Sequence, residues 1–302
     1  MLLTLLLAAA PAHLSGAQSA DAESIEIPPP IRAMLDAAIA SGNENEVATI
    51  VKYARAADPA SGDAVLRVAN EWRTVQAKDR ETRIVRAGWT SLWTGRAEIG
   101  GFVTTGNSET AGVTGILDLT REGLEWRHKI RGQADFQRSL GITTREHYLA
   151  AYEPNWKVDS RKYVYGALQY ESDRFLGYTD RFSASAGAGY SAVQTSALTL
   201  NLELGPAFRH TDFTDATTES SIAARGNVDL DWKLTSGLTL RQDASAYLQR
   251  YNSTVSSTTA MAARLLGPLS AQLSYTVQYE SMPPIGRVST DTTSRASLVY
   301  TF

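Results

Sequence analysis

Histidine side chains are the first candidates for chemistry in this sequence, because a neutral imidazole can accept a proton or bind a metal ion. The chain has four: His13, His128, His147 and His210. No two of them stand at the spacing of a metal-binding motif, and the chain has no cysteine. The stretch 100–110, "GGFVTTGNSET", lacks the lysine and the following helix of a phosphate-binding loop, and is more typical of a strand that enters a hairpin turn. The sequence therefore predicts neither a metal site nor a cofactor.

A serine and a histidine could together support hydrolysis of a lipid. His210 ends one expected strand and Ser220 begins the next, and both fall on the apolar side of their strands. A serine nucleophile needs a base within hydrogen-bond reach and a third group that orients the base, and the sequence identifies no third group. A lipid hydrolase is thus an alternative, and the main prediction is that the protein is not an enzyme. His147 lies on the polar side, where a hydrogen bond to Asp135 or Glu171 is expected.

Charged side chains of both signs recur at every second position of the expected strands. They are predicted to line the lumen of a barrel, and the main positions are Arg96, Glu98, Arg127, Lys129, Arg131, Glu153, Glu171, Glu203, Arg209, Arg225, Asp229, Arg241 and Arg295. Hairpin geometry brings Lys129 close to Glu153, and Asp229 close to Arg241. Mutual neutralisation in a polar lumen is the favoured interpretation of these pairs, ahead of a substrate site.

The strands that must carry these side chains are indicated by a change of period. From about residue 92 onward, apolar and polar residues alternate, as in 124–137, where the odd positions are charged or amide side chains. Reversing that strand would turn Arg127, Lys129 and Arg131 toward lipid, at about 2–4 kcal/mol each at mid-depth. The pattern predicts twelve strands, at about 92–104, 109–119, 124–137, 145–156, 161–172, 181–192, 197–210, 220–232, 238–251, 259–266, 269–281 and 290–302.

Two features favour a membrane barrel over a soluble sheet. The connections alternate between short turns and mostly longer loops, as in outer-membrane barrels with short periplasmic turns. The aromatic residues sort by height into two girdles, as expected where rings lie at the level of the lipid headgroups. The periplasmic girdle is Trp93, Trp126, Trp156 and Trp232, and the outer girdle is Phe136, Tyr148, Phe182, Phe208 and Tyr279. The predicted fold is a twelve-stranded antiparallel outer-membrane β-barrel over 92–302, preceded by a short helical periplasmic segment.

The residues before the barrel have a helical period or the composition of a leader. Residues 1–20 resemble a secretory signal peptide, with an N-terminal membrane-anchored helix as the alternative. Residues 21–91 are predicted to be a helical periplasmic segment and linker, with helices at about 30–41, 44–56 and 59–80. Asn43 and Glu46 fit a capping box, and Asp58 followed by Pro59 fits the start of the third helix. The segment 28–86 could bind a periplasmic partner.

Four stretches resemble the family of bacterial salt-induced outer-membrane proteins, whose barrel is a domain of unknown function. They are "GGFVTTGNSET", "YGALQYESDRFLGYTDRFSASAGAGY", "LELGPAFRH" and "DTTSRASLVYTF". The resemblance covers about 93–302, and it implies an outer-membrane location in a gram-negative cell and a link to salt or osmotic stress. It implies no reaction, and the helical segment lies outside it.

The end of the sequence reads as the closing strand of the barrel. Tyr300 and Phe302 share the lipid-facing parity, and an aromatic C-terminus of this kind resembles the signal that the barrel-assembly machinery recognises. The other expected partner is outer-membrane lipid, whereas a net charge of −3 argues against nucleic acid. The predicted function is a narrow pore or passive envelope barrel for small solutes or ions, and the alternative is a structural or interaction barrel that uses the helices and the outer loops.

Overall fold

The computed structural model describes residues 27–105, 110–139, 142–250, 252–283 and 288–302. The predicted signal peptide and the predicted first hairpin turn lie outside the described residues. The chain divides into two compact units, one that ends at Thr82 and one that begins at Arg83. Each unit is described separately below.

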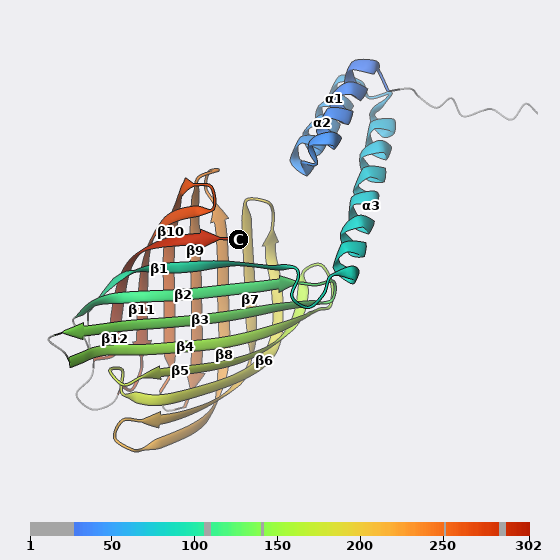
Figure 1. Ribbon diagram of the computed structural model, residues 1–302. Helices are drawn as coiled ribbons and strands as arrows, with labels where there is room; N and C mark the ends of the chain where they lie inside the picture. Colours follow the sequence, from blue (N-terminus) through green and yellow to red (C-terminus); the bar gives the residue numbers. More distant parts are fainter. Residues whose placement is uncertain (1–26, 106–109, 140–141, 251, 284–287) are drawn as a thin grey trace, which may run out of the picture. The chain divides into compact units, whose positions relative to one another are not determined.

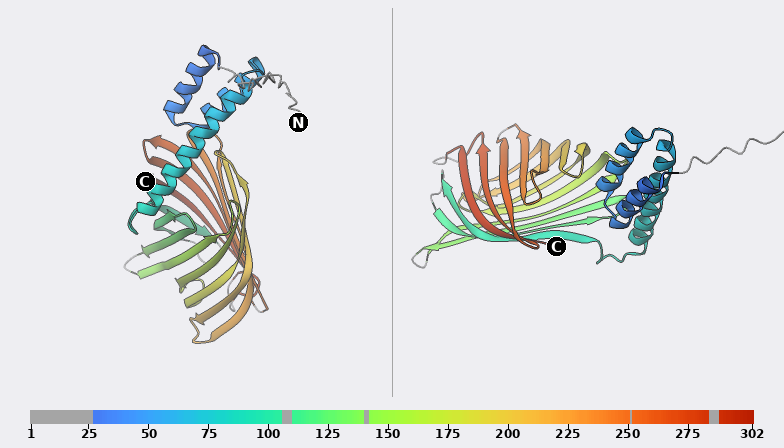
Figure 2. Two further views of the ribbon diagram at one scale, coloured as in Figure 1. Left: turned by 90° about the vertical axis from the view of Figure 1, so that its right-hand side faces the viewer. Right: turned by 90° about the horizontal axis from the view of Figure 1, so that it is seen from above.

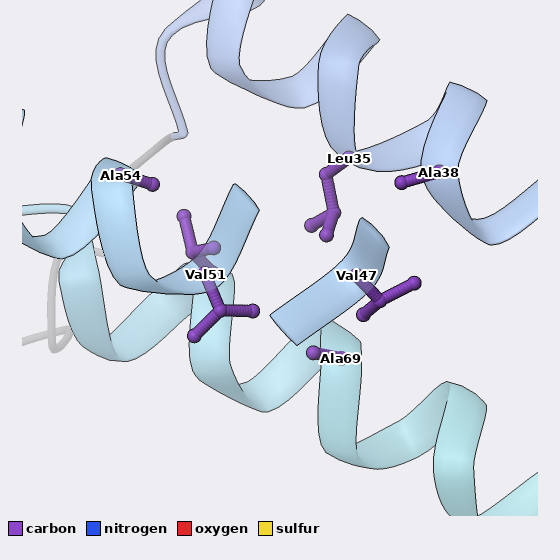
Figure 3. Close-up of a cluster of buried hydrophobic side chains, with 7 residues drawn as sticks. Leu35, Ala38, Val47, Val51, Ala54 and Ala69 are labelled. Carbon is purple, nitrogen blue, oxygen red and sulfur yellow. The ribbon is translucent and has the colours of Figure 1, made fainter. Parts of the chain in front are cut away.

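The first unit is built from helices α1 (Pro29–Ser41), α2 (Glu44–Ala57) and α3 (Gly62–Arg86). Their apolar faces meet in a small core in which Leu35, Val47 and Val65 are completely buried. Figure 3 shows Leu35 of α1, Val47 of α2 and Ala69 of α3 converging in this core. Within the described part of the chain, no helix is both long and apolar enough to cross a membrane.

The capping residues explain where α2 begins and where α3 departs from expectation. The side chain of Asn43 accepts a hydrogen bond from the backbone of Asn45 at 3.0 Å, and its amide donates to Glu46 at 3.0 Å. Asp58 does not cap α3: its backbone N–H donates to Ala54 at 2.8 Å, so it ends α2 instead. Helix α3 starts later than predicted, and it continues six residues past the predicted end to Arg86, where glutamate and arginine are good helix formers.

The second unit is a closed antiparallel barrel of twelve strands, each paired with its neighbours in sequence (Figure 1). Figure 2 shows the strands following one another around the wall. The strands are β1 (Trp93–Thr105), β2 (Thr110–Glu122), β3 (Trp126–Ser139), β4 (Ile142–Lys157), β5 (Lys162–Asp173), β6 (Tyr178–Gln194), β7 (Leu198–Phe213), β8 (Thr218–Lys233), β9 (Leu238–Gln249), β10 (Thr254–Leu266), β11 (Leu269–Glu280) and β12 (Thr290–Thr301). The seam between β12 and β1 closes the wall, as predicted, and leaves no unpaired edge.

The end of the barrel at which β1 begins and β12 ends is called the terminal end, and the opposite end is called the loop end. Several strands extend further toward the loop end than predicted, so some connections there are as tight as the turns of the terminal end. Only 174–177 separate β5 from β6, because Asp173 accepts hydrogen bonds from the backbones of Phe175 and Leu176, both at 2.9 Å, and folds the chain back. The expected contrast in loop length is therefore wrong at this hairpin, and also between β7 and β8, where only 214–217 separate the strands.

The two faces of the wall have opposite character. Side chains on the outer face are apolar and exposed, such as Ile222 at 80%, Ile99 at 71% and Leu204 at 69%. On the inner face Glu203 is 5% exposed and Arg209 is 4% exposed. An apolar band of this extent would be unstable in water and is stabilised by hydrocarbon, and a closed barrel satisfies every backbone group without an edge. The barrel is therefore a membrane-spanning barrel.

The β6–β7 ladder has a gap, called the crease, where Gly187 and Gly205 face each other. The ladder pairs Ser185 with Ala207 and resumes only at Ala188 with Leu204, because Pro206 has no N–H to donate. A Cβ atom at Gly205 would lie 2.2 Å from the carbonyl oxygen of Ala186, so the two strands approach too closely for any side chain.

The variant Gly205→Val is expected to destabilise the barrel by about 3 kcal/mol, because the clash is with backbone that cannot move without opening the ladder. The measurement is the urea midpoint of the refolded protein together with its heat-modifiable mobility on a gel. Gly132→Val is the matched control, since a Cβ atom there meets nothing within 4 Å. Equal urea midpoints for Gly205→Val and Gly132→Val would contradict the inference that β6 and β7 approach too closely at the crease for a side chain.

Candidate functional site

The lumen is the candidate site, because it gathers most of the charged side chains of the barrel. The thirteen charged positions named from the sequence lie on the face of the sheet that also carries the buried side chains, and further charges join them. The additional ones with ion pairs include Asp118, Asp135, Arg145, His147, Asp173, Arg181, Asp231 and Glu280. Among the described residues, no group of three or more histidine or carboxylate side chains is arranged to hold a metal ion.

One cluster is centred on Glu203 of β7. Its carboxylate accepts hydrogen bonds from Arg225 at 3.0 Å and from the hydroxyl of Tyr163 at 3.0 Å, and it lies 3.9 Å from the ammonium of Lys129. Lys129 pairs with Glu153 at 2.9 Å, as the hairpin geometry predicts, and Arg225 also reaches Glu153 at 3.4 Å. Since β4 and β8 are four strands apart in the wall, the Arg225 contact crosses the lumen.

A second cluster is centred on Asp135 of β3, nearer the loop end. Its carboxylate accepts hydrogen bonds from Thr114 at 2.6 Å and from Arg295 at 3.4 Å. Nδ1 of His147 lies 3.3 Å from it, so the predicted partner of this histidine is confirmed. The guanidinium of Arg145 lies 4.0 Å from the carboxylate of Asp135 and 3.8 Å from the carboxylate of Asp173 on β5. The cluster therefore ties together β2, β3, β4, β5 and β12.

A third contact links opposite walls of the barrel. Arg181 of β6 reaches Glu280 of β11 at 3.4 Å, and these strands are five steps apart around the wall. The other oxygen of the Glu280 carboxylate accepts a hydrogen bond from Asn252 at 3.3 Å. The guanidinium of Arg181 lies 3.8 Å from the ring centre of Tyr178, which holds it in place. The lumen is thus crossed at more than one level by paired side chains.

Aromatic rings inside the lumen were not identified from the sequence, although several follow from strand parity. Tyr165 is 1% exposed and Tyr163 is 4% exposed, both at inward positions of β5. Arginines stack on the lumenal rings at centre distances of 3.8–5.3 Å, in the pairs Arg127–Tyr163, Arg145–Phe102, Arg181–Tyr178, Arg209–Tyr247 and Arg225–Tyr165. These stacks fill the lumen and fix the orientation of its cations.

The predicted contact between Asp229 and Arg241 is wrong. Arg241 instead forms a 2.6 Å ion pair with Asp231, its direct partner in the β8–β9 ladder, whereas Asp229 pairs in register with Asp243. The turn 234–237 sets a register two residues away from the one assumed, and a charge pair on the same face changes partner accordingly.

The residues assigned to the two girdles point outward. Trp126, Trp156 and Trp232, toward the terminal end, are 44–47% exposed, and the rings assigned toward the loop end are 41–51% exposed, namely Phe136, Tyr148, Phe182, Phe208 and Tyr279. Trp93 is more covered, because its ring meets Trp89 edge-on at 6.1 Å and its Nε1 donates to the carbonyl of Trp89 at 3.0 Å. Tyr300 and Phe302 lie exposed and stacked at the end of β12, with ring centres 6.2 Å apart.

The serine and histidine considered for hydrolysis are brought together on the outer face. Nδ1 of His210 lies 2.7 Å from Oγ of Ser220, across the β7–β8 ladder. Nε2 of the same ring lies 3.5 Å from Oδ1 of Asp212, a residue that the sequence prediction placed beyond the end of the strand.

Comparison with known proteins places the barrel in a family. The family model described as "Protein of unknown function, DUF481" matches residues 97–302. Uncharacterized protein YdiY of Escherichia coli strain K12 is 23% identical over 190 residues, which cover 63% of this chain and 75% of the relative. Among solved structures, the NanC porin aligns over 68% of this chain and 98% of its own, at 11% identity and a TM-score of 0.48. An outer membrane channel from Pseudomonas putida F1 aligns over 72% and 100%, at 8% identity and a TM-score of 0.43. Because the family model covers more than half of the residues, the chain belongs to the DUF481 family.

Proposed function

We propose that the protein is an outer-membrane barrel that passes small ions or solutes slowly, through a lumen narrowed by ion pairs that join opposite walls. The observation that carries the proposal is the Arg181–Glu280 contact, which spans five strand steps at 3.4 Å. A twelve-strand barrel lies between eight-strand barrels filled by side chains and open porins of sixteen or more strands, so side-chain pairs decide how open it is. Cations and carboxylates alternate in the lumen, and weak ion selectivity follows.

The proposal fixes an orientation in the membrane. The terminal end, at which both ends of the barrel's chain lie, faces the periplasm together with the helical segment, and the loop end faces outward, as in outer-membrane barrels with an even number of strands. Tyr300 and Phe302 serve as the assembly signal at the terminal end. A link to salt or osmotic stress belongs to this proposal through the family resemblance.

The test is the single-channel conductance of the refolded full-length protein in a planar bilayer. The wild type is expected to show a small conductance, and the double variant Arg181→Ala/Glu280→Ala a conductance several-fold larger, because two long side chains no longer meet across the lumen. Arg241→Ala/Asp231→Ala is the matched control: this pair joins adjacent strands, so its removal leaves the conductance unchanged.

Conductance at background level in the wild type and in both variants would contradict the pore. That result would favour the second candidate, an interaction protein that acts through its helices. A groove of about 490 Å³ between α2 and α3 supports this candidate, since Lys52, Arg55 and Arg73 line it together with apolar side chains such as Leu66. Its composition suits an amphipathic, acidic partner.

A further inference from the structure

The outer face of the barrel carries a linked serine, histidine and aspartate near the loop end. Oγ of Ser220 lies 2.7 Å from Nδ1 of His210, and Oδ1 of Asp212 lies 3.5 Å from Nε2 of the same ring. The aspartate is held in turn, because the hydroxyl of Thr218 donates to its Oδ1 at 3.0 Å. The three groups come from two neighbouring strands, which position them rigidly.

The arrangement supplies a base within hydrogen-bond reach of the serine and a carboxylate beside that base, the third group that the sequence did not identify. A carboxylate beside one ring nitrogen favours the proton on that nitrogen, so the other nitrogen is free to accept the proton of the serine. The histidine contacts the serine and the aspartate through opposite nitrogens, as a base with an orienting carboxylate must. In serine proteases Nε2 of the histidine faces the serine and Nδ1 faces the aspartate. Here Nδ1 faces Ser220 and Nε2 faces Asp212, and the histidine can still take the proton from the serine and pass it to the leaving group.

The surroundings indicate which molecules reach this site. His210 is the ladder partner of Phe182 on β6, and it follows Phe208 on its own strand. Both rings are about half exposed on the outer face, as is typical of aromatic side chains at the level of the lipid headgroups. The ester bonds of membrane lipids lie at this boundary between headgroups and hydrocarbon. About a third of the His210 side chain is exposed, so a lipid ester can reach it.

We propose that Ser220, His210 and Asp212 form a hydrolytic site for acyl esters of membrane lipids. Oγ of Ser220 attacks the ester carbonyl while Nδ1 of His210 takes the hydroxyl proton. The ester bond breaks, the acyl group stays on Ser220, and the lipid alcohol leaves with the proton from His210. Water, activated by His210, then attacks the acyl-enzyme and releases the fatty acid. The site lies on the outer face of the wall and is independent of the lumen, so it can act whether or not the lumen conducts.

The first test uses a fluorophosphonate probe on the full-length barrel, refolded in detergent. An activated serine displaces fluoride from the probe and becomes phosphonylated, so labelling reports activation without knowledge of the substrate. Ser220 of the wild type is expected to be labelled, Ser220→Ala to show none, and His210→Ala to label at least tenfold more slowly. Ser221→Ala is the matched control, because this neighbouring serine points into the lumen and bonds to Gln249 at 3.1 Å.

The second test measures fatty acid release from mixed micelles of phosphatidylethanolamine. Ser220→Ala and His210→Ala are expected to reduce release to background, whereas Ser221→Ala matches the wild type. Asp212 is a positioning residue, so Asp212→Asn lowers kcat about tenfold with KM unchanged, and Asp212→Glu restores part of the rate. Heat-modifiable mobility on a gel verifies that each variant is folded.

Three results would overturn the proposal. They are a folded wild type that the probe does not label, label found on a residue other than Ser220, and fatty acid release that survives in Ser220→Ala. Labelling without any fatty acid release would overturn the assignment of lipid esters as the substrate.

Discussion

Removal of Phe302 is expected to reduce the folded barrel in the outer membrane to about a tenth or less. The residue exchanges two backbone hydrogen bonds with Gly95 of β1, at 2.8 and 2.9 Å. Losing both costs about 2 kcal/mol and exposes unpaired backbone groups at the seam, where lipid offers no replacement. The ring also packs over Gly95, since a Cβ atom there would lie 3.1 Å from Cζ of Phe302. The measurement is the amount of heat-modifiable protein in isolated outer membranes.

Two substitutions separate the backbone contribution from the ring. Phe302→Ala keeps both hydrogen bonds and removes the ring, so a loss in this variant isolates the proposed assembly signal. Phe302→Tyr keeps the two backbone hydrogen bonds and an aromatic ring, and it is expected to insert into the membrane normally. Wild-type amounts of the truncated protein in the outer membrane would show that neither the bonds nor the ring matters for assembly.

Replacement of Glu203 by alanine is expected to lower the free energy of unfolding by about 3 kcal/mol. The carboxylate side chain is buried, and it neutralises Arg225 and Lys129. Its loss leaves these two cations to share Glu153 inside the lumen. Removing one partner of a buried ion pair typically lowers the free energy of unfolding by about 3–5 kcal/mol. Because water reaches the lumen, we expect a loss near the lower end of this range. Urea unfolding of the barrel in detergent micelles, followed by tryptophan fluorescence, measures the change.

The control for Glu203 is a carboxylate in an exposed pair. Glu122 pairs with Lys157 at the terminal end and is 40% exposed, so Glu122→Ala should cost less than about 1 kcal/mol. The double variant Glu203→Leu/Arg225→Leu removes one charge of each sign and keeps the Lys129–Glu153 pair. It is therefore expected to be more stable than Glu203→Ala alone, and a larger loss in the double variant would contradict the electrostatic explanation.

The alternation from residue 92 onward was sufficient to predict twelve strands and the face on which each side chain lies, whereas the choice of a membrane barrel over a soluble sheet also needed the sorting of the aromatic residues by height. The alternation also gave the Lys129–Glu153 pair, because both residues lie on the inner face and they are direct partners in the β3–β4 ladder. It could not predict the Arg181–Glu280 contact, whose partners are 99 residues apart on strands that do not touch. Which side chains meet across the lumen depends on the tilt and stagger of all twelve strands. The alternation of apolar and polar residues along one strand gives neither the tilt nor the stagger.

The ends of the strands could not be predicted accurately either, and Asp212 of the outer-face site was missed for this reason. The apolar alternation of β7 stops near His210, where the strand leaves hydrocarbon, so the following residues read as a loop. In the structure β7 continues to Phe213, which places Asp212 on the same face as His210. Beyond the lipid both faces of a strand are solvated, and no apolar pattern is left to mark where the strand ends.

The seam that closes the barrel also has a consequence for the order of folding. Ser297 of β12 hydrogen-bonds to Glu98 of β1, 199 positions earlier in the chain, whereas every other neighbouring pair of strands is consecutive in sequence order. Closure must therefore wait until the final strand has been made and exported, and contacts of such long range form slowly. During that interval β1 presents an unsatisfied edge able to recruit strands from other chains. The lifetime of this open sheet therefore sets the risk of aggregation among newly made chains.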